Sequence, residues 1–249
     1  MSDNKGKRPG QRNTCGEKGL TRTSTGPLFD AIARRYDLLN HLLSGGVDVY
    51  WRRRALAGVP PRPQRVLDLA TGTGDLALAA CRLEPGCVVG VDVALEMLRL
   101  GRGKIQRRHL ERRVHLLAGD ALCLPFPSGV FDLVTAAFGV RNFADIPAGL
   151  AEAHRVLVPG GQLVVLDFSE PRAPLFGALY RLYFRRLLPV VGGLVSGNRS
   201  AYAYLPRSVG SFPQGKGFLE LLGQAGFGRC TATPLTLGIC SLYRALKDG

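Results

Sequence analysis

The stretch VLDLATGTGDLALAA, residues 66–80, decides how the rest of the chain is interpreted. An apolar run is interrupted by Asp68, passes through Gly72 and Gly74, and resumes with the spacing of a helix. This order predicts a strand, a tight glycine turn and a helix. In an open α/β sheet, a ligand binds at the carboxyl end of such a strand, and glycines let the backbone approach it closely.

From residue 65 onward, segments typical of strands alternate with segments typical of helices. The expected strands read apolar on both faces, which is typical of a parallel sheet covered by helices on both sides. The fold class is therefore α/β: a Rossmann-like, doubly wound, mostly parallel sheet with an antiparallel C-terminal edge. The expected strands are 66–69, 87–92, 114–120, 131–138, 162–168, 230–235 and 240–246, and the expected helices are 76–82, 94–109, 147–157 and 217–227.

The flanking segments differ from this core in composition. Residues 1–25 are mostly glycine, basic residues, serine and threonine, which predicts a disordered basic arm before a single domain at 26–249. Residues 28–56 have the apolar spacing of amphipathic helices. An insertion at about 171–215 is apolar enough, with interspersed arginines, to cover a lipophilic substrate.

Composition limits the class of protein and of partner. The 249 residues are 46% hydrophobic and 21% charged, which is typical of a globular domain. A net charge of +14 points to an anionic partner, either nucleic acid or an anionic membrane surface, unless the arginines are simply solvated. With no apolar run of about 18–20 residues and no secretory-type N-terminus, we expect a cytoplasmic protein.

The residues that commonly bind metals are scattered. Six cysteines form no C-x-x-C pair, and four histidines form no H-E-x-x-H pattern. We therefore expect no metal site.

The ligand of the glycine turn is either a nicotinamide cofactor or S-adenosylmethionine. The segment GTGDLA at 72–77 satisfies the weak dinucleotide pattern G-x-G-x-x-A. Against it, Asp68 precedes the turn, where a carboxylate suits a cationic amino-acid group and repels a pyrophosphate. Asp92 ends the next strand and can accept both ribose hydroxyls. Asp120 and the Ala121 N–H can bind an adenine ring. Some 65 residues precede the turn, whereas dehydrogenases usually begin with it. These features favour S-adenosylmethionine.

Longer motifs extend this interpretation over most of the chain. They are FDAIARRYDLLNHLLSGGVDVYWRR, VLDLATGTGDLA, LPFPSGVFDLVTAAFGVRNFAD, EAHRVLVPGGQLVVLDFSEP and YLPRSVGSFP. On these residues the chain, from about Phe29 to Leu246, resembles the demethylmenaquinone and ubiquinone C-methyltransferase family, a class I group that uses S-adenosylmethionine. The first motif and FGVRN are specific to that family, whereas the glycine turn and PGG occur across class I methyltransferases.

The resemblance implies cofactor contacts at Thr73, Asp92, Asp120 and Ala121, beside Asp68, Gly72 and Gly74 of the turn. Two positions depart from the family pattern: Ala70 replaces the first glycine of the turn, and Ala137 stands where relatives commonly have serine.

The implied reaction is C-methylation of 2-demethylmenaquinol, a prenylated quinol, to menaquinol. We expect Arg141 to stabilise the developing phenolate, Asn142 to orient the oxygen or a water, and Tyr36 to close over the methyl donor. For Arg141 the structural alternative is a buried ion pair with Asp75 or Asp145.

Four other functions compete with this one. The benzoquinol methylation of ubiquinone synthesis is the nearest, alone or as a second activity. A nucleic-acid methyltransferase would explain the charge, but the chain has neither an N-P-P-Y motif nor an RNA-binding module, so no nucleic-acid partner is expected. A nicotinamide oxidoreductase and a basic membrane adaptor without activity fit Asp68, Asp92 and Asp120 poorly. Peripheral contact with the inner face of the cell membrane is an expectation, and homo-oligomer formation stays open.

Overall fold

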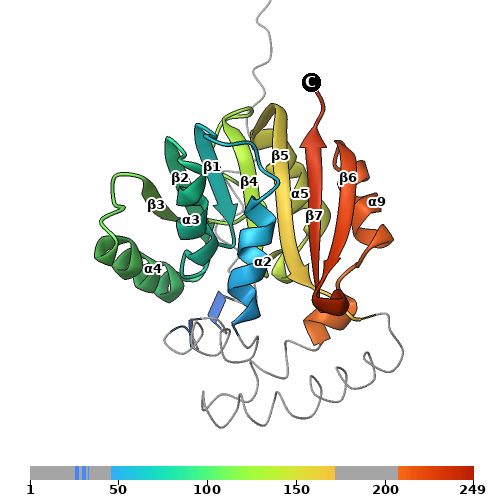
Figure 1. Ribbon diagram of the computed structural model, residues 1–249, viewed down its shortest axis with the longest axis horizontal. Coiled ribbons are helices and arrows are strands. Elements are labelled where there is room, and N and C mark those ends of the chain that lie inside the picture. The colour runs from blue at the N-terminus through green and yellow to red at the C-terminus, as the bar shows by residue number, and fades with distance from the viewer. Residues whose placement is uncertain (1–25, 28–29, 32, 34–45, 172–206) are drawn as a thin grey trace, which may run out of the picture.

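The computed structural model describes residues 26–27, 30–31, 33, 46–171 and 207–249 (Figure 1). The expected basic arm (1–25), Tyr36 and most of the expected substrate cover (172–206) lie outside the described residues. No helix among the described residues is long and apolar enough to cross a membrane.

A seven-stranded sheet with the order β3-β2-β1-β4-β5-β7-β6 forms the centre of the molecule. β3, β2, β1, β4 and β5 pair in parallel, as predicted from their apolar character on both faces. β7 pairs antiparallel with both β5 and β6, which places the predicted antiparallel pairing at the C-terminal edge. The strands are β1 (Arg65–Leu69), β2 (Cys87–Asp92), β3 (Val114–Ala118), β4 (Phe131–Ala137), β5 (Leu157–Phe168), β6 (Phe227–Leu235) and β7 (Cys240–Lys247).

Helices cover both faces of the sheet and give it two cores. One core joins the sheet to α2, α3 and α4, and the other joins it to α5 and α9 (Figure 1). The helices are α2 (Val47–Leu56), α3 (Asp75–Ala80), α4 (Leu95–Arg107), α5 (Ile146–Val156) and α9 (Lys216–Gln224), with 3₁₀ turns at Cys81–Leu83, Val140–Asn142 and Thr236–Gly238.

The alternation of side chains along β1 explains why the site forms at its end. Val66 points into the core under α2 and α3, whereas Leu67 and Leu69 point into the core under α5 and α9. Asp68 shares the face of Val66 but is the last side chain there before the turn. The carboxyl ends of β1, β2 and β4 therefore meet the glycine turn at one edge of the sheet.

β5 begins five residues earlier than its apolar run predicts, because the segment Pro159-Gly160-Gly161 continues the strand. Its pairing with β4 shifts register between Phe131 and Leu133. Gly160 has a positive φ of 76°, and a Cβ on Gly161 would lie 2.8 Å from the Val158 carbonyl oxygen. These two glycines therefore permit an irregularity that apolar periodicity does not reveal.

Candidate functional site

The turn between β1 and α3 exposes bare backbone, as its glycines predict. Gly72 and Gly74 have positive φ values of 55° and 80°. A Cβ added to Gly72 would meet no atom within 4 Å, so the space beside this backbone is open. Gly74 lines neither of the recesses described below, and its positive φ gives it a conformational role in the turn.

Ala70 occupies the position where the family resemblance leads one to expect glycine, and it adopts the conformation that glycine favours. Its φ is 48°, in the left-handed region that is costly for alanine. Its methyl group packs against Gly139 in the loop after β4, where an added Cβ would lie 2.3 Å from the Ala70 Cβ. The absence of a side chain at Gly139 therefore makes room for the alanine at position 70.

Asp68 is buried and binds two other parts of the site, the turn and β4. Its two carboxylate oxygens accept hydrogen bonds from the hydroxyls of Thr71 in the turn and Thr135 in β4, each at 2.6 Å. Burial raises the pKa of Asp68 to about 6, although the two hydroxyls and the nearby charge of Arg52 act in the opposite direction. A carboxylate with this pKa is ionised at neutral pH, and a cationic ligand beside it would stabilise its buried charge.

Asp92 ends β2, as predicted, and its carboxylate organises the turn on the neighbouring strand. It accepts hydrogen bonds from the Gly72 N–H at 2.7 Å and from the Ala94 N–H at 2.8 Å. Burial raises its pKa, and the backbone donors oppose the shift. Asp92 therefore holds Gly72 in place as well as facing the adjacent cavity.

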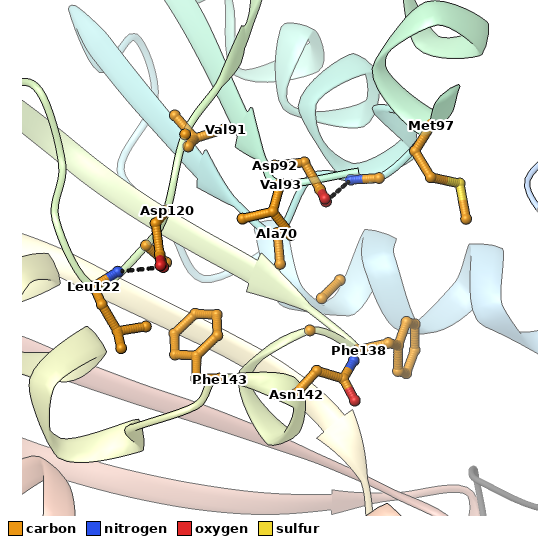
Figure 2. A pocket seen from close by; sticks show the side chains of 15 residues that line it. Ala70, Val91, Asp92, Val93, Met97, Asp120, Leu122, Phe138, Asn142 and Phe143 are labelled. Carbon is orange, nitrogen blue, oxygen red and sulfur yellow. Dashed lines mark hydrogen bonds between the residues drawn. The ribbon is translucent and has the colours of Figure 1, made fainter. Parts of the chain in front are cut away.

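A recess at this edge of the sheet, here called the larger recess, brings together the predicted residues Gly72, Asp92, Asp120, Ala121 and Asn142. It encloses about 640 Å³ between protein atoms, part of it open to solvent. Asp120 lies after β3, and its carboxylate accepts the Leu122 N–H at 3.0 Å. Figure 2 shows Asp92 and Asp120 on one side of the recess and Phe138, Asn142 and Phe143 on the opposite side.

A smaller and more polar recess of about 380 Å³ adjoins the first. Both recesses are lined by Ala70, Gly72, Ala137 and Phe138, so they lie side by side around these residues. The predicted residues Asp68 and Thr73 line the smaller recess, and Arg52 of α2 lies beside them. The Thr73 hydroxyl accepts a hydrogen bond from Lys104 Nζ at 2.8 Å, which fixes the turn against α4.

Arg141 forms a buried ion pair, and its partner is Asp167. Arg141 Nη1 lies 2.7 Å from Asp167 Oδ1, and the two side chains are 3% and 0% exposed. The proposed partners Asp75 and Asp145 were wrong: Asp75 pairs with Lys104, and Asp145 caps α5 by accepting the Ala148 N–H. The reason is the strand order, because β4 lies beside β5 and the loop after β4 meets the end of β5.

The Arg141 side chain also fixes the loop that carries it. Its Nη1 donates to the Phe138 carbonyl, and its guanidinium lies 5.4 Å from the Phe168 ring centroid. Phe138 has a positive φ of 59°, an unfavourable conformation that this hydrogen bond helps to maintain. Arg141 Nε is buried and has no hydrogen-bond partner among the described residues. Arg141 lines neither recess, whereas Asn142 lines the larger one.

An aromatic cluster joins α2 to the same loop. Trp51 packs against Phe138 and Phe168 with ring centroids 5.9 and 6.0 Å apart, and its indole N–H donates to the Thr236 hydroxyl at 2.7 Å. α2 is thereby held over the carboxyl end of the sheet.

Several residues of the site were missed by the sequence analysis. Arg52, Phe138 and Asp167 belong to it because helix packing and strand order bring them there. Asp167 could have been found, because it is the penultimate residue of a strand whose run at 163–168 is otherwise apolar, near the same edge of the sheet as Asp92. The described residues contain no group of three or more histidines, cysteines and acidic residues that could hold a metal ion.

Comparison with known proteins shows a match to the ubiE/COQ5 methyltransferase family model over residues 18–247. A Thermus thermophilus protein named demethylmenaquinone methyltransferase is 52% identical, with 87% of this chain and 98% of that protein covered. A Deinococcus radiodurans protein of the same name is 47% identical, with 93% and 96% covered. A Geotalea uraniireducens protein named ubiquinone/menaquinone biosynthesis C-methyltransferase UbiE is 45% identical, with 87% and 93% covered.

Solved structures with similar folds have low sequence identity to this chain. A Haloferax volcanii putative methyltransferase in complex with the Trm112 activator has a TM-score of 0.64 at 19% identity, with 89% of this chain and 98% of that chain covered. A Haemonchus contortus phosphoethanolamine N-methyltransferase in complex with S-adenosyl-L-methionine has a TM-score of 0.58 at 17% identity, with 79% and 53% covered. These likenesses support the fold alone.

Proposed function

Because the chain belongs to the ubiE/COQ5 methyltransferase family, we propose that it transfers a methyl group from S-adenosylmethionine to a ring carbon of 2-demethylmenaquinol. The product is menaquinol, and the reaction is the last step of menaquinone synthesis. The observation that carries the proposal is the near-complete coverage of relatives named demethylmenaquinone methyltransferase. The enzyme is an S-adenosylmethionine-dependent C-methyltransferase.

The residues of the two recesses fit this methyl donor. We assign the ribose hydroxyls to Asp92 and the adenine ring to Asp120 and the Ala121 N–H, which line the larger recess together. Met97, Leu122 and Phe143 supply apolar surface for the adenine. Asp68 faces the smaller recess, where an ionised carboxylate suits an ammonium group. The open space beside Gly72 lets the backbone lie against the donor.

The chemistry needs little from the protein beyond orientation and charge. S-adenosylmethionine supplies an electrophilic methyl group on a sulfonium. Loss of a proton from a quinol hydroxyl raises the electron density of the ring, and the unsubstituted ring carbon then forms the new C–C bond as the C–S bond breaks. Loss of the ring proton restores the aromatic ring. Holding the two reactants in line supplies much of the acceleration.

We assign the acceptor side of the reaction to Arg141, Asn142 and Tyr36. Arg141 lines neither recess and its Nη1 is occupied by Asp167 and the Phe138 carbonyl, so we assign it an electrostatic role: its positive charge, held in the loop that carries Asn142, stabilises negative charge on the quinol oxygen. Asn142, on the wall of the larger recess, orients that oxygen or a water. Tyr36, outside the described residues, closes over the methyl donor.

The second candidate acceptor is the methoxy-polyprenyl-benzoquinol of ubiquinone synthesis, favoured by the relatives named for both pathways. Mass spectrometry of quinones from cells that lack the gene separates the two. Accumulated demethylmenaquinone is the expected result, and complementation with the intact gene should remove it. An accumulated methoxybenzoquinol precursor with normal menaquinone would assign the benzoquinol reaction instead.

We also propose that the protein contacts the inner face of the cell membrane without crossing it. The support is the net charge of +14 and the six basic residues against two acids within residues 1–28. Each lysine or arginine near an anionic leaflet contributes about 1 kcal/mol, and salt screens the effect. Deletion of residues 1–25 should reduce sedimentation with anionic vesicles at low salt and leave donor affinity unchanged. Equal sedimentation of both forms would show that the arm is passive.

A further inference from the structure

Arg52 is a buried cation in the donor site that comes from outside the sheet. It lies on α2, in the segment before β1, and its side chain is 10% exposed. It lines the smaller recess together with Asp68, Thr71 and Thr73 of the strand and turn. A buried arginine needs a compensating negative charge, so the partners of Arg52 show whether part of its guanidinium can bind a ligand.

Two aspartates hold Arg52 unequally. Nη1 donates to Asp48 Oδ2, one turn earlier on the same helix. Nη2 lies 3.6 Å from Asp75 Oδ2, which is too long for a hydrogen bond. Asp75 is itself bound by Lys104 Nζ at 2.6 Å. Asp75 therefore keeps a cation when the Nη2 side of Arg52 turns to another carboxylate.

The two recesses differ in charge. The larger recess presents the carboxylates of Asp92 and Asp120 and would repel an anion. The smaller recess presents the carboxylates of Asp68 and Asp75 and the guanidinium of Arg52. Asp75 is already paired with Lys104 Nζ at 2.6 Å, which leaves Asp68 and Arg52 as one charge of each sign for a ligand. This pair complements the ammonium and carboxylate groups of an α-amino acid. The lining residues common to both recesses place the two next to each other, as one molecule with an adenosine end and an amino-acid end would require.

We propose that Arg52 receives the α-carboxylate of the methyl donor in the smaller recess. This inference rests on the proposed function for the identity of the methyl donor, S-adenosylmethionine. It does not depend on which quinol accepts the methyl group. Asp68 and Arg52 then recognise the two charges of the amino-acid end, while Asp48 orients the guanidinium. α2 becomes part of the donor site, and the Trp51 cluster holds it in place.

Calorimetric titration without acceptor tests this assignment. The probes are S-adenosylmethionine and its decarboxylated form, which keeps the sulfonium and the amine. The unmodified protein should bind S-adenosylmethionine roughly tenfold or more tightly than the decarboxylated form, as expected for a charged hydrogen bond. Arg52→Gln should abolish this preference and leave binding of the decarboxylated form nearly unchanged. Arg53→Gln, an exposed change on the same helix, is the matched control and should keep the preference.

The substitution leaves Asp48 buried beside a neutral side chain, so a second variant guards against misfolding. Asp48→Asn with Arg52→Gln removes both charges and should show the same loss of preference. A folded Arg52→Gln or double variant that keeps the preference would overturn the assignment, as would an unmodified protein without any preference. An unmodified protein that binds neither probe would instead contradict the proposed function.

Discussion

Arg141→Gln is expected to lower kcat by about 10²–10³ and to destabilise the protein by about 3–5 kcal/mol. The loss of turnover follows from removing the positive charge that stabilises the developing quinol oxygen and from loosening the loop that carries Asn142. The loss of stability follows because Asp167, 0% exposed, would keep a buried charge without its 2.7 Å partner. Denaturant unfolding and steady-state kinetics measure the two effects separately.

A double variant separates the two roles of Arg141. Arg141→Gln with Asp167→Asn removes both charges, so it should recover much of the lost stability and little of the lost turnover. Arg99→Gln, which breaks an exposed ion pair with Glu96, is the control and should change neither quantity measurably. If the double variant has normal kcat, Arg141 supports the fold alone and the search for the acceptor residue moves to Tyr36.

Asp92→Ala is expected to weaken donor binding by roughly 2 kcal/mol, about 30-fold in Kd. Two ribose hydroxyls would lose a charged acceptor, and the Gly72 and Ala94 N–H groups would lose theirs. Calorimetry with S-adenosylhomocysteine, the demethylated product, avoids turnover during the measurement.

Asp132→Asn is the matched control for Asp92→Ala. Asp132 accepts the Arg65 N–H at 2.7 Å at the start of β1, the opposite edge of the sheet from the recesses. Its substitution should leave product affinity unchanged. A folded Asp92→Ala protein with unchanged affinity would remove Asp92 from the donor site.

The fold was predictable because its strands are apolar on both faces and its turns carry glycine. The same rule located Gly72, Asp92, Asp120 and Ala121, since each follows or ends a strand of the parallel sheet. Asp167 as the partner of Arg141 was not predictable from spacing: the two are 26 positions apart, and only the pairing of β4 with β5 brings them together. Arg52 was missed for a similar reason: its place in the site depends on how α2 packs over the sheet.

The strained backbone conformations of two residues could not be predicted from the sequence either. Ala70 at φ 48° and Phe138 at φ 59° carry side chains where glycine is favoured. Each is held by a contact from a distant segment, the first by the space at Gly139 and the second by the Arg141 guanidinium. Residue type alone predicts neither conformation.

Because the pKa of Asp68 is raised, a fall in pH changes two properties in opposite directions: it adds to the folding stability that this residue contributes, and it weakens donor binding. In the donor-free protein its pKa is about 6, against 3.8 for the ordinary side chain. The folded chain therefore binds this proton more tightly than the unfolded chain, and the resulting stability is fully present below pH 3.8 and lost as the pH rises through 6. A cationic donor favours the ionised carboxylate, so binding below pH 6 must displace the proton and grows weaker as the pH falls. Calorimetry near pH 6 in buffers of different ionisation enthalpy should register this release. Through Asp68, acid thus favours the donor-free folded protein, and neutral pH favours the donor-bound one.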